Sequence, residues 1–305
     1  MICPVCDSHK TEFYGKVERF KPALFYQKCL HCESVFQRET APDPDDYYNE
    51  DYYSGNASFA YHDGRKSYPA DRIVHRARLQ TILRMLSLMR GHMVESSSLK
   101  LLDVGCAFGS FVRSANEFMQ AAGLDVSRYS ITAGNEWIAK QKNPAFLGLH
   151  RGSLWHLPRL PLFANETFDV ITLIEVAEHL HNPRANFESA YRLLKPGGLL
   201  LIQTANFSGW QAIKEQLNYH YLLPGHLVCY SSGGLTSLLK DIGFREFREF
   251  IPVDFPLSAK LKKAGYGFKF LNLFKMIKIA AYHWRSQNIV ERRPATSSWV
   301  LYAFK

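Results

Sequence analysis

A short apolar strand that runs into a small-residue turn constrains this chain more than any other feature. Residues 101–104 (Leu-Leu-Asp-Val) precede Gly105, Ala107 and Gly109, and an amphipathic stretch follows over residues 110–119. This order predicts a strand, a tight loop and a helix N-terminus. Small residues let the backbone approach a ligand closely, and the free N–H groups of the helix start point at it.

A second acidic residue indicates which ligand to expect. The next apolar run ends in Gly123-Leu124-Asp125, about 20 residues after Asp103. In Rossmann-type units, an acid at this position accepts hydrogen bonds from ribose hydroxyl groups. We therefore expect Asp125 to bind the ribose of an adenosine-containing cofactor, with Val126 beside it.

The downstream sequence favours one cofactor over NAD. Residues 168–174 form an apolar strand that ends in Ile174 and continues into the acidic turn Glu175-x-x-Glu178-His179. Residues 193–202 place Pro-Gly-Gly between a predicted helix, which it is expected to stop, and a further strand. The ordered motifs resemble the class I S-adenosylmethionine-dependent methyltransferases over about residues 99–250.

The resemblance implies an α/β fold, with a Rossmann-like seven-stranded sheet and helices on both faces. It also implies that Asp103 accepts hydrogen bonds from the methionine end of S-adenosyl-L-methionine and that the small-residue loop passes beneath the sulfonium. Alanine at position 107 replaces a commoner glycine and disfavours a positive φ there, and Ser153 stands where an Asp is usual. The expected cofactor-binding residues are Asp103, Gly105, Ala107, Gly109, Asp125, Val126, Ser153, Leu154 and Ile174.

A cluster of acids and imidazoles is expected at the acceptor end of the site. Glu175, Glu178 and His179 follow a buried strand, and His226 lies in a later loop. Two carboxylates and imidazoles can hold a hard divalent cation, and the arrangement resembles the magnesium-binding turn of small-RNA 2′-O-methyltransferases and ubiquinone-pathway O-methyltransferases. Alternatively, Glu178 and His179 cap the following helix without a metal. His226 is then either a general base or a buried structural histidine.

Paired cysteines define an N-terminal module. Cys3 and Cys6 are separated by 22 residues from Cys29 and Cys32, and each pair has two residues between its members. Two such knuckles bring four thiolates to one tetrahedral zinc with no open position. The sequence therefore predicts a structural zinc in residues 1–40, to which Cys106 and Cys229 do not contribute.

The basic charge of the chain is concentrated near its C-terminus. Residues 257–293 hold nine Lys and Arg residues against one acid, Glu291, which gives +8 of the net charge of +9. Apolar residues recur there at helical spacing, interrupted at Gly265 and Gly267; they are Leu261, Ala264, Phe268, Leu271, Phe274, Ile277 and Ala281. Such a segment either binds an anionic membrane or a phosphate-bearing substrate, or it buries its stripe as a lid or homodimer helix.

The remaining segments complete the predicted organisation. We expect residues 41–98 to hold a linker and a helix over 69–91, and residues 205–230 to form a long loop. A helix over 232–242, a strand at Phe244–Ile251 and a final edge strand at Ser298–Phe304 follow. The predicted units are 1–40 (zinc ribbon), 41–98, 99–251 (methyltransferase core) and 252–305. In the tyrosine-rich stretch 47–53, Tyr52 or Tyr53 either closes over the cofactor or packs between the units.

Composition limits the functions to consider. A chain of 305 residues can bury one α/β core and a small module. It has no apolar run of 18 residues and no signal-peptide pattern, so a cytoplasmic or membrane-peripheral protein is expected. The expected function is O-methylation of a small molecule such as a sugar, glycolipid or quinone-like acceptor. The alternatives are a zinc-ribbon RNA methyltransferase, disfavoured by the weak basic character of residues 1–40, and a non-catalytic cofactor-binding scaffold.

Overall fold

A seven-stranded sheet forms the centre of the computed structural model, which describes residues 1–38, 48–54, 63–267 and 271–305. Its strands, in spatial order, are β10 (Glu246–Phe250), β13 (Ser298–Phe304), β8 (Leu194–Ala205), β7 (Phe168–Ile174), β4 (Lys100–Val104), β5 (Gln120–Asp125) and β6 (Phe146–Arg151). The strands from β8 to β6 pair in parallel, and β13 is antiparallel to both of its neighbours. The predicted Rossmann-like seven-stranded sheet is confirmed.

The last strand lies inside the sheet, so the prediction of an edge strand at Ser298–Phe304 is wrong. Strand β13 inserts between β8 and β10, and β10 forms the edge. Residues 299–304 are all buried. A strand that is apolar on both faces needs a neighbour on each side, whereas β10 is more polar and suits the edge.

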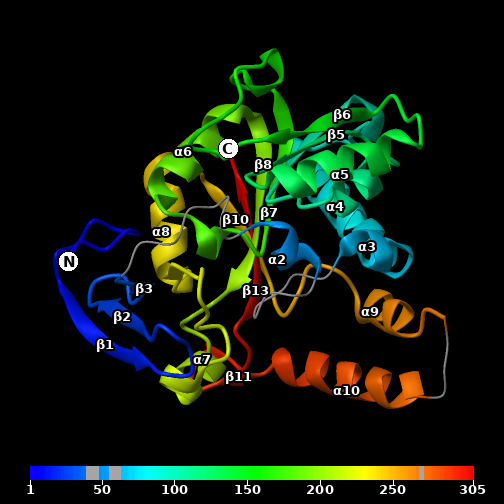
Figure 1. Cartoon of the computed structure of the whole chain (residues 1–305). Helices are drawn as coiled ribbons and strands as arrows, with labels where there is room; N and C mark the ends of the chain where they lie inside the picture. The colour runs from blue at the N-terminus through cyan, green and yellow to red at the C-terminus, as the bar shows by residue number, and fades with distance from the viewer. Residues whose placement is uncertain (39–47, 55–62, 268–270) are drawn as a thin grey trace.

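Helices cover both faces of the sheet. In Figure 1, α3 (Gly64–Arg90), α4 (Ser110–Ala115) and α5 (Arg128–Ala139) lie on one side, and α6 (Pro183–Leu193) and α8 (Ser232–Ile242) on the other. Alternation along the strands explains this layering: Leu101 belongs to the core beneath α3–α5, whereas the next residue, Leu102, belongs to the core beneath α6 and α8. Strands covered on both faces read as continuous apolar runs, as the sequence shows.

Two helix boundaries differ from those predicted. Helix α3 starts at Gly64 rather than at 69, because Asp63 accepts a hydrogen bond from the Arg65 backbone N–H as N-cap and Pro69 is accommodated inside the helix. Helix α6 ends at Leu193 before the Pro-Gly-Gly segment is reached. That segment lies within β8, where the pairing with β7 shifts register, so its expected role as a helix stop is wrong.

The N-terminal module is joined to the later loop by a shared sheet. Strands β1 (Thr11–Val17), β2 (Leu24–Cys29) and β3 (Val35–Gln37) form an antiparallel sheet whose fourth strand is β9 (Val228–Cys229). The segment predicted as a loop over 205–230 thus contains β9, and it also contains α7 (Trp210–Glu215). A strand of two residues is too short to show an alternating pattern in the sequence. Residues 228–229 form a strand only because they pair with β3.

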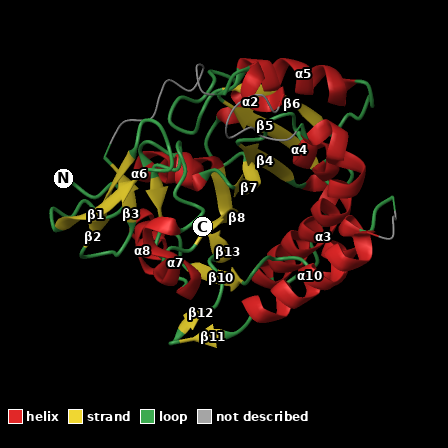
Figure 2. Ribbon diagram, turned by 60° about the horizontal axis from the view of Figure 1, so that its bottom comes forward, coloured by secondary structure: helices red, strands yellow, loops and turns green. Residues whose placement is uncertain are grey.

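The basic C-terminal segment folds back across the sheet side that carries α3. It forms α9 (Leu257–Ala264), α10 (Leu271–Ser286) and a small hairpin of β11 (Ile289–Val290) and β12 (Arg293–Pro294). Figure 2 shows this hairpin below the central sheet. Within the described residues, no helix is both long and apolar enough to cross a membrane. A short helix, α2 (Glu50–Ser54), carries part of the tyrosine-rich stretch, whereas Tyr47, Phe268 and the linker residues 41–46 lie outside the described residues.

A buried ion pair connects α3 to the segment before α9. The Arg78 guanidinium donates from Nε to the Asp254 carboxylate at 2.8 Å, and the Tyr302 hydroxyl donates to the same carboxylate at 2.6 Å. Both charged side chains are buried. Removing one partner of such a pair leaves an uncompensated buried charge.

We expect Arg78→Met to lower the free energy of unfolding by about 3–5 kcal/mol, because the Asp254 charge then stays buried without its partner. Urea denaturation followed by circular dichroism measures this. The matched control is Arg72→Met on the same helix, where the Arg72–Glu117 pair is solvent-exposed and Glu117 keeps Arg76 as a partner. That variant should lose less than about 1 kcal/mol, and equal losses in the two variants would contradict the assignment.

Candidate functional site

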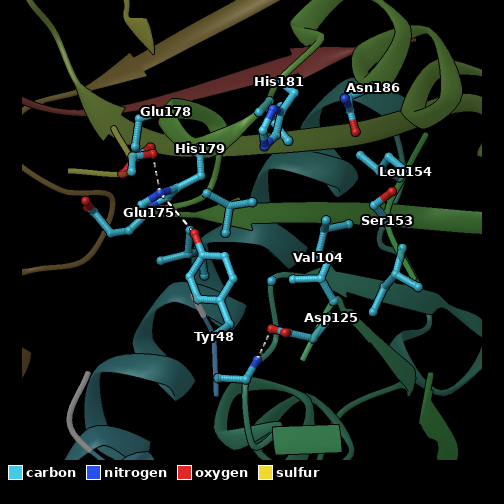
Figure 3. A pocket seen from close by; sticks show the side chains of 18 of the residues that line it. Tyr48, Val104, Asp125, Ser153, Leu154, Glu175, Glu178, His179, His181 and Asn186 are labelled. Atoms are coloured by element: carbon cyan, nitrogen blue, oxygen red, sulfur yellow. Dashed lines mark hydrogen bonds between the residues drawn. The ribbon is translucent and has the colours of Figure 1, made fainter. Parts of the chain in front are cut away.

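A large cavity lies at the carboxyl ends of β4, β5 and β7, where open α/β sheets bind their ligands. Its volume is about 760 Å³. One wall is formed by the loops after β4 and β5, the opposite wall by the turn after β7 and the loop 223–226, and α2 contributes tyrosines across the opening. Figure 3 shows these side chains converging on the cavity from separate elements.

The small-residue loop after β4 follows the predicted path, with one correction. Gly105 has φ 68, and a Cβ there would lie 2.3 Å from the Val176 side chain, so only glycine fits. Ala107 also has a positive φ, of 47, although alanine was expected to avoid it. Its backbone N–H donates to the Asp125 carboxylate at 2.8 Å. That hydrogen bond helps to offset the cost of the left-handed conformation, about 1–2 kcal/mol.

The two motif acids occupy different environments. Asp125 lines the cavity, and its second carboxylate oxygen accepts the Ser127 backbone N–H at 2.9 Å. Asp103 does not line the cavity: its carboxylate accepts the Thr172 hydroxyl at 2.7 Å, and burial raises its pKa to about 7. Gly109, like Asp103, supports the loop from outside the cavity lining. The predicted contacts of these two residues with a cofactor therefore remain predictions.

The other predicted cofactor residues share one region of the cavity. The residues that line it are Gly105, Ala107, Asp125, Val126, Ser153, Leu154 and Ile174. The lining also includes Trp155 and His156, whose rings stack with centroids 5.7 Å apart and which the sequence analysis did not single out. The sequence could have indicated them, because the two rings follow the predicted cofactor residues Ser153 and Leu154. Exposed aromatic rings beside a ribose site offer a stacking surface.

The acids after β7 are bridged by a tyrosine that sequence analysis missed. The Tyr221 hydroxyl lies 2.5 Å from a carboxylate oxygen of Glu175 and 2.5 Å from one of Glu178. A phenol has one proton, so it donates to only one carboxylate at a time. Burial, together with the charge of Glu178, raises the pKa of Glu175 to about 7. A proton on Glu175 lets that carboxyl donate to the tyrosine oxygen while Tyr221 donates to Glu178.

Two further side chains complete the surroundings of the acids. The Gln203 amide donates to Glu175 at 2.6 Å, and the Thr204 hydroxyl donates to Glu178 at 2.8 Å. Both come from the carboxyl end of β8, next to β7 in the sheet. These contacts depend on which strands are neighbours, and no sequence motif marks them.

Two imidazoles lie near Glu178. His226 Nδ1 lies 2.8 Å from the Tyr221 carbonyl oxygen, and His179 Nδ1 lies 2.8 Å from the Gly225 carbonyl oxygen. Carbonyl oxygens only accept, so each neutral ring carries its proton on Nδ1 and leaves Nε2 as an acceptor. Burial lowers the His226 pKa to about 4, which keeps it neutral at pH 7.

The metal-ligating atoms of Glu178, His179 and His226 all lie within 4.8 Å of one another. A backbone carbonyl that holds the remote N–H of an imidazole is the usual outer contact of a metal-bound histidine. These three side chains therefore fit a divalent cation. Glu175, which was predicted as a fourth ligand, lies across Tyr221 and is not part of this group.

Comparison with known proteins agrees with the geometry. The model of the methyltransferase domain family matches residues 68–246 of the chain, which is more than half of it. The chain belongs to this methyltransferase family. The predicted resemblance to S-adenosylmethionine-dependent methyltransferases is confirmed, and the loops after β4 and β5 lie in the matched region.

The individual relatives differ in what they methylate. The methyltransferase is 24% identical over 202 residues to a sterol 24-C-methyltransferase of Candida albicans, an alignment that covers 61% of this chain and 53% of that protein. It is 25% identical over 197 residues to a mitochondrial ubiquinone biosynthesis O-methyltransferase of Candida albicans, with 60% and 57% covered. The chain thus spans about half the length of these curated relatives.

A solved structure shares the fold. The phosphoethanolamine N-methyltransferase 2 of Haemonchus contortus, solved in complex with S-adenosyl-L-methionine, superposes with a TM-score of 0.51 at 14% identity. The superposition covers 88% of the methyltransferase and 61% of that chain.

The N-terminal module holds the loop that carries Tyr221 and His226. The Arg19 guanidinium donates to the carbonyl oxygens of Leu217, Tyr219 and Leu222 at 2.7–2.9 Å. The Gln37 side-chain amide donates to the carbonyl oxygens of Leu223 and His226 at 2.8 and 2.9 Å. The backbone on both sides of His226 is therefore fixed by residues from the other end of the methyltransferase chain.

The four N-terminal cysteines converge on one point. Cys3 Sγ lies 3.6 Å from Cys32 Sγ, Cys6 Sγ lies 3.6 Å from Cys29 Sγ, and all four sulfurs lie within 4.8 Å of one another. Sulfurs of a tetrahedral zinc, with Zn–S bonds of about 2.3 Å, are separated by about 3.8 Å. The four thiols therefore fit a zinc ion. Cys106 and Cys229 lie elsewhere, and Cys229 is on β9.

We expect the raised pKa of Glu175 to produce a pH-dependent stability difference between the methyltransferase and its Glu175→Gln variant. The pKa of an unperturbed Glu is near 4.5, and that of folded Glu175 is about 7. The stability gained from this proton is complete below pH 4.5 and is lost as the pH rises through about 7. The melting temperature of the wild type minus that of Glu175→Gln should therefore fall across this interval.

Scanning calorimetry in EDTA-containing buffers measures this difference without interference from bound metal. Asp103 has a similarly raised pKa, but it is present in both proteins, so its contribution cancels. A difference that stays constant from pH 4.5 to 8 would contradict the assigned protonation of Glu175.

Proposed function

We propose that this methyltransferase transfers the methyl group of S-adenosyl-L-methionine to a hydroxyl group of a small molecule. The proposal rests on one observation: Asp125 and the residues around it line the same cavity as Glu178, His179 and His226. The first group suits an adenosine-containing methyl donor. The second suits a hydroxyl acceptor, because it combines a carboxylate with two imidazoles.

At the donor end, the roles follow from hydrogen-bonding capacity. Each carboxylate oxygen of Asp125 accepts one backbone N–H and keeps a further lone pair that can accept from a ribose hydroxyl. Gly105 allows the chain to approach the donor closely, and Ser153, Leu154 and Trp155 offer a half-apolar surface for an adenine ring. S-adenosyl-L-methionine itself supplies a methyl group on a positively charged sulfur, which any correctly placed oxygen nucleophile can attack.

At the acceptor end, the three ligand residues favour a divalent cation over a simple base. A general base works best with a pKa near the operating pH, and burial places the His226 pKa at about 4. The same neutral imidazole is the form that binds metals. Glu178, His179 and His226 would hold the ion, which would lower the pKa of a nearby hydroxyl. Magnesium was the ion expected from sequence, but two nitrogen ligands extend the choice to manganese and zinc.

The acceptor class follows from the cavity and the relatives together. About 760 Å³ accommodates the donor and a small acceptor. A relative at 25% identity is named as a ubiquinone biosynthesis O-methyltransferase, and we extend its oxygen-directed chemistry to this chain as part of the proposal. A sugar, a glycolipid or a quinone-like compound with a hydroxyl group fits this cavity volume and this oxygen-directed chemistry. Neither of them requires a nucleic acid as the methyl acceptor.

We expect His226→Ala to reduce turnover by about 100-fold while its affinity for S-adenosylhomocysteine stays near that of the wild type, because His226 lies at the acceptor end. Incubation of the protein with labelled S-adenosyl-L-methionine and fractionated lipids, nucleotide-sugars or quinones measures turnover, and calorimetry measures affinity. Asp125→Ala is the matched contrast, in which affinity itself should be lost.

Metal removal separates the two acceptor-end mechanisms. With a cation at Glu178, His179 and His226, EDTA should abolish turnover, and added magnesium or manganese, which do not suit the four cysteine thiolates, should restore it. Activity that is insensitive to EDTA but lost in His226→Ala would leave His226 as a base. Full activity of His226→Ala would reject both roles and leave positioning of donor and acceptor as the source of rate.

We further propose that Cys3, Cys6, Cys29 and Cys32 bind one structural zinc. The support is the clustering of four sulfurs within 4.8 Å in a module of short strands that has little apolar core of its own. The ion would fix the turns that flank β1–β3, and through β3 it would stabilise β9 and the loop bearing His226.

One zinc per chain is the expected result of elemental analysis, and the double variant Cys29→Ser/Cys32→Ser should lose it because the second knuckle then supplies no sulfur ligand. Cys229→Ala serves as the control and should keep one zinc, although it lies in the same sheet. Zinc at full occupancy in the double variant would reject the assignment.

A further inference from the structure

The outward face of α10 carries exposed apolar side chains in a continuous stripe. Leu273, Ile277, Ala281 and Trp284 are spaced by four, four and three residues, which places them on one side of the helix. Leu273 is 44% exposed, Ile277 58% and Trp284 68%. The alternative in which the segment buries its stripe as a lid within the chain is therefore not met for Ile277 and Ala281.

The opposite face attaches α10 to the protein. His283 and Ser286 are buried there, and Met276 and Ile279 are partly buried. The Tyr282 hydroxyl bonds the Thr296 hydroxyl at 2.7 Å, which anchors the end of the helix to the segment before β13. Figure 1 shows α10 packed along α9 at the bottom of the molecule. Attachment thus uses a different set of side chains from the exposed stripe.

A basic stripe runs next to the apolar one. Lys278 and Arg285 are seven residues apart, so they share one side of the helix next to the apolar stripe, and both are exposed. Lys275 is also exposed, but it lies further round the helix, toward the attached face. The helix contains no acidic residue. The hairpin that follows α10 adds one exposed apolar residue, Ile289, and one exposed basic residue, Arg292.

We propose that α10 binds the surface of an anionic phospholipid bilayer, with its apolar stripe at the boundary between head groups and acyl chains and its basic stripe among the phosphates. A helix that is apolar along one side, with a Trp there, and basic along the next is the type that lies in this interface. Basic side chains beside the stripe can extend to the head groups while their methylene stems cover apolar surface.

Charge favours a bilayer over a second copy of the chain. In a two-fold dimer the same patch faces itself, so Lys278 and Arg285 would meet their own equivalents without any acid on α10 to compensate them. An anionic bilayer supplies the complementary charge instead. The binding proposed here does not depend on the methyl acceptor.

Vesicle co-sedimentation of the full chain tests the proposal. Vesicles of phosphatidylcholine mixed with phosphatidylglycerol should bind the wild type, phosphatidylcholine alone should bind it at least about tenfold more weakly, and added salt should weaken binding. The variant Ile277→Glu/Trp284→Glu should bind the mixed vesicles at least about tenfold more weakly than the wild type. Because both positions are exposed, its melting temperature should match that of the wild type.

The control adds the same two charges at exposed apolar positions elsewhere. Leu88 and Met93, at 67% and 87% exposure, lie at the end of α3 and just beyond it, so Leu88→Glu/Met93→Glu should bind vesicles as the wild type does. Equal loss in both variants, or wild-type binding by the α10 variant, would overturn the proposal. So would a wild-type dimer that dissociates in the α10 variant without any vesicle binding, which sedimentation velocity would detect. No methyl donor or acceptor is added, so failure here is distinct from failure of the proposed reaction.

Discussion

Backbone pairing between β3 and β9 connects the two sides of the large cavity. The carboxyl ends of β4, β5 and β7 supply one wall, but Tyr221 and His226 come from a segment that has little regular structure of its own. That segment is held by the pairs Val35–Cys229 and Phe36–Val228 and by the hydrogen bonds of Arg19 and Gln37. Without them, the position of His226 relative to Glu178 would have to be maintained by loop residues alone, at a high cost in conformational entropy.

The acceptor end illustrates how a sheet concentrates polar groups. Glu175 and Glu178 follow β7, and Gln203 and Thr204 lie at the end of β8. The Tyr221 hydroxyl lies within hydrogen-bonding distance of both acids. Two neighbouring carboxylates repel each other, and the hydrogen bond from Tyr221 together with a proton on Glu175, favoured by its raised pKa, relieves that repulsion. His179 and His226 lie beside Glu178 in this arrangement. The polar network thus orients the groups that would contact an acceptor.

Charge is distributed to suit two different surroundings. The cavity holds a neutral His226 and a Glu175 whose pKa is raised to about 7, whereas α10 exposes lysines and apolar side chains together. The buried Arg78–Asp254 pair lies between these regions, where it joins α3 to the start of the basic segment, and Arg78 also donates to Gln203 beside Glu175. The same arginine therefore contacts both the anchor of the C-terminal segment and the polar network of the cavity.

Sequence alone determined the features that depend on local pattern. The strand–turn–helix at Asp103–Gly109, the acid at Asp125, the spacing of the four cysteines and the helix of residues 232–242 could all be predicted, because each is set by neighbours along the chain. Tertiary structure decided the rest. The insertion of β13 between β8 and β10, the two-residue strand β9 and the contacts of Tyr221 all depend on partners distant in sequence. Ala107 adopts its positive φ only because the loop and the Asp125 carboxylate hold it there. Local patterns specify which elements form, whereas the pairing of distant strands selects which side chains share a cavity, and no periodicity within one segment encodes that pairing.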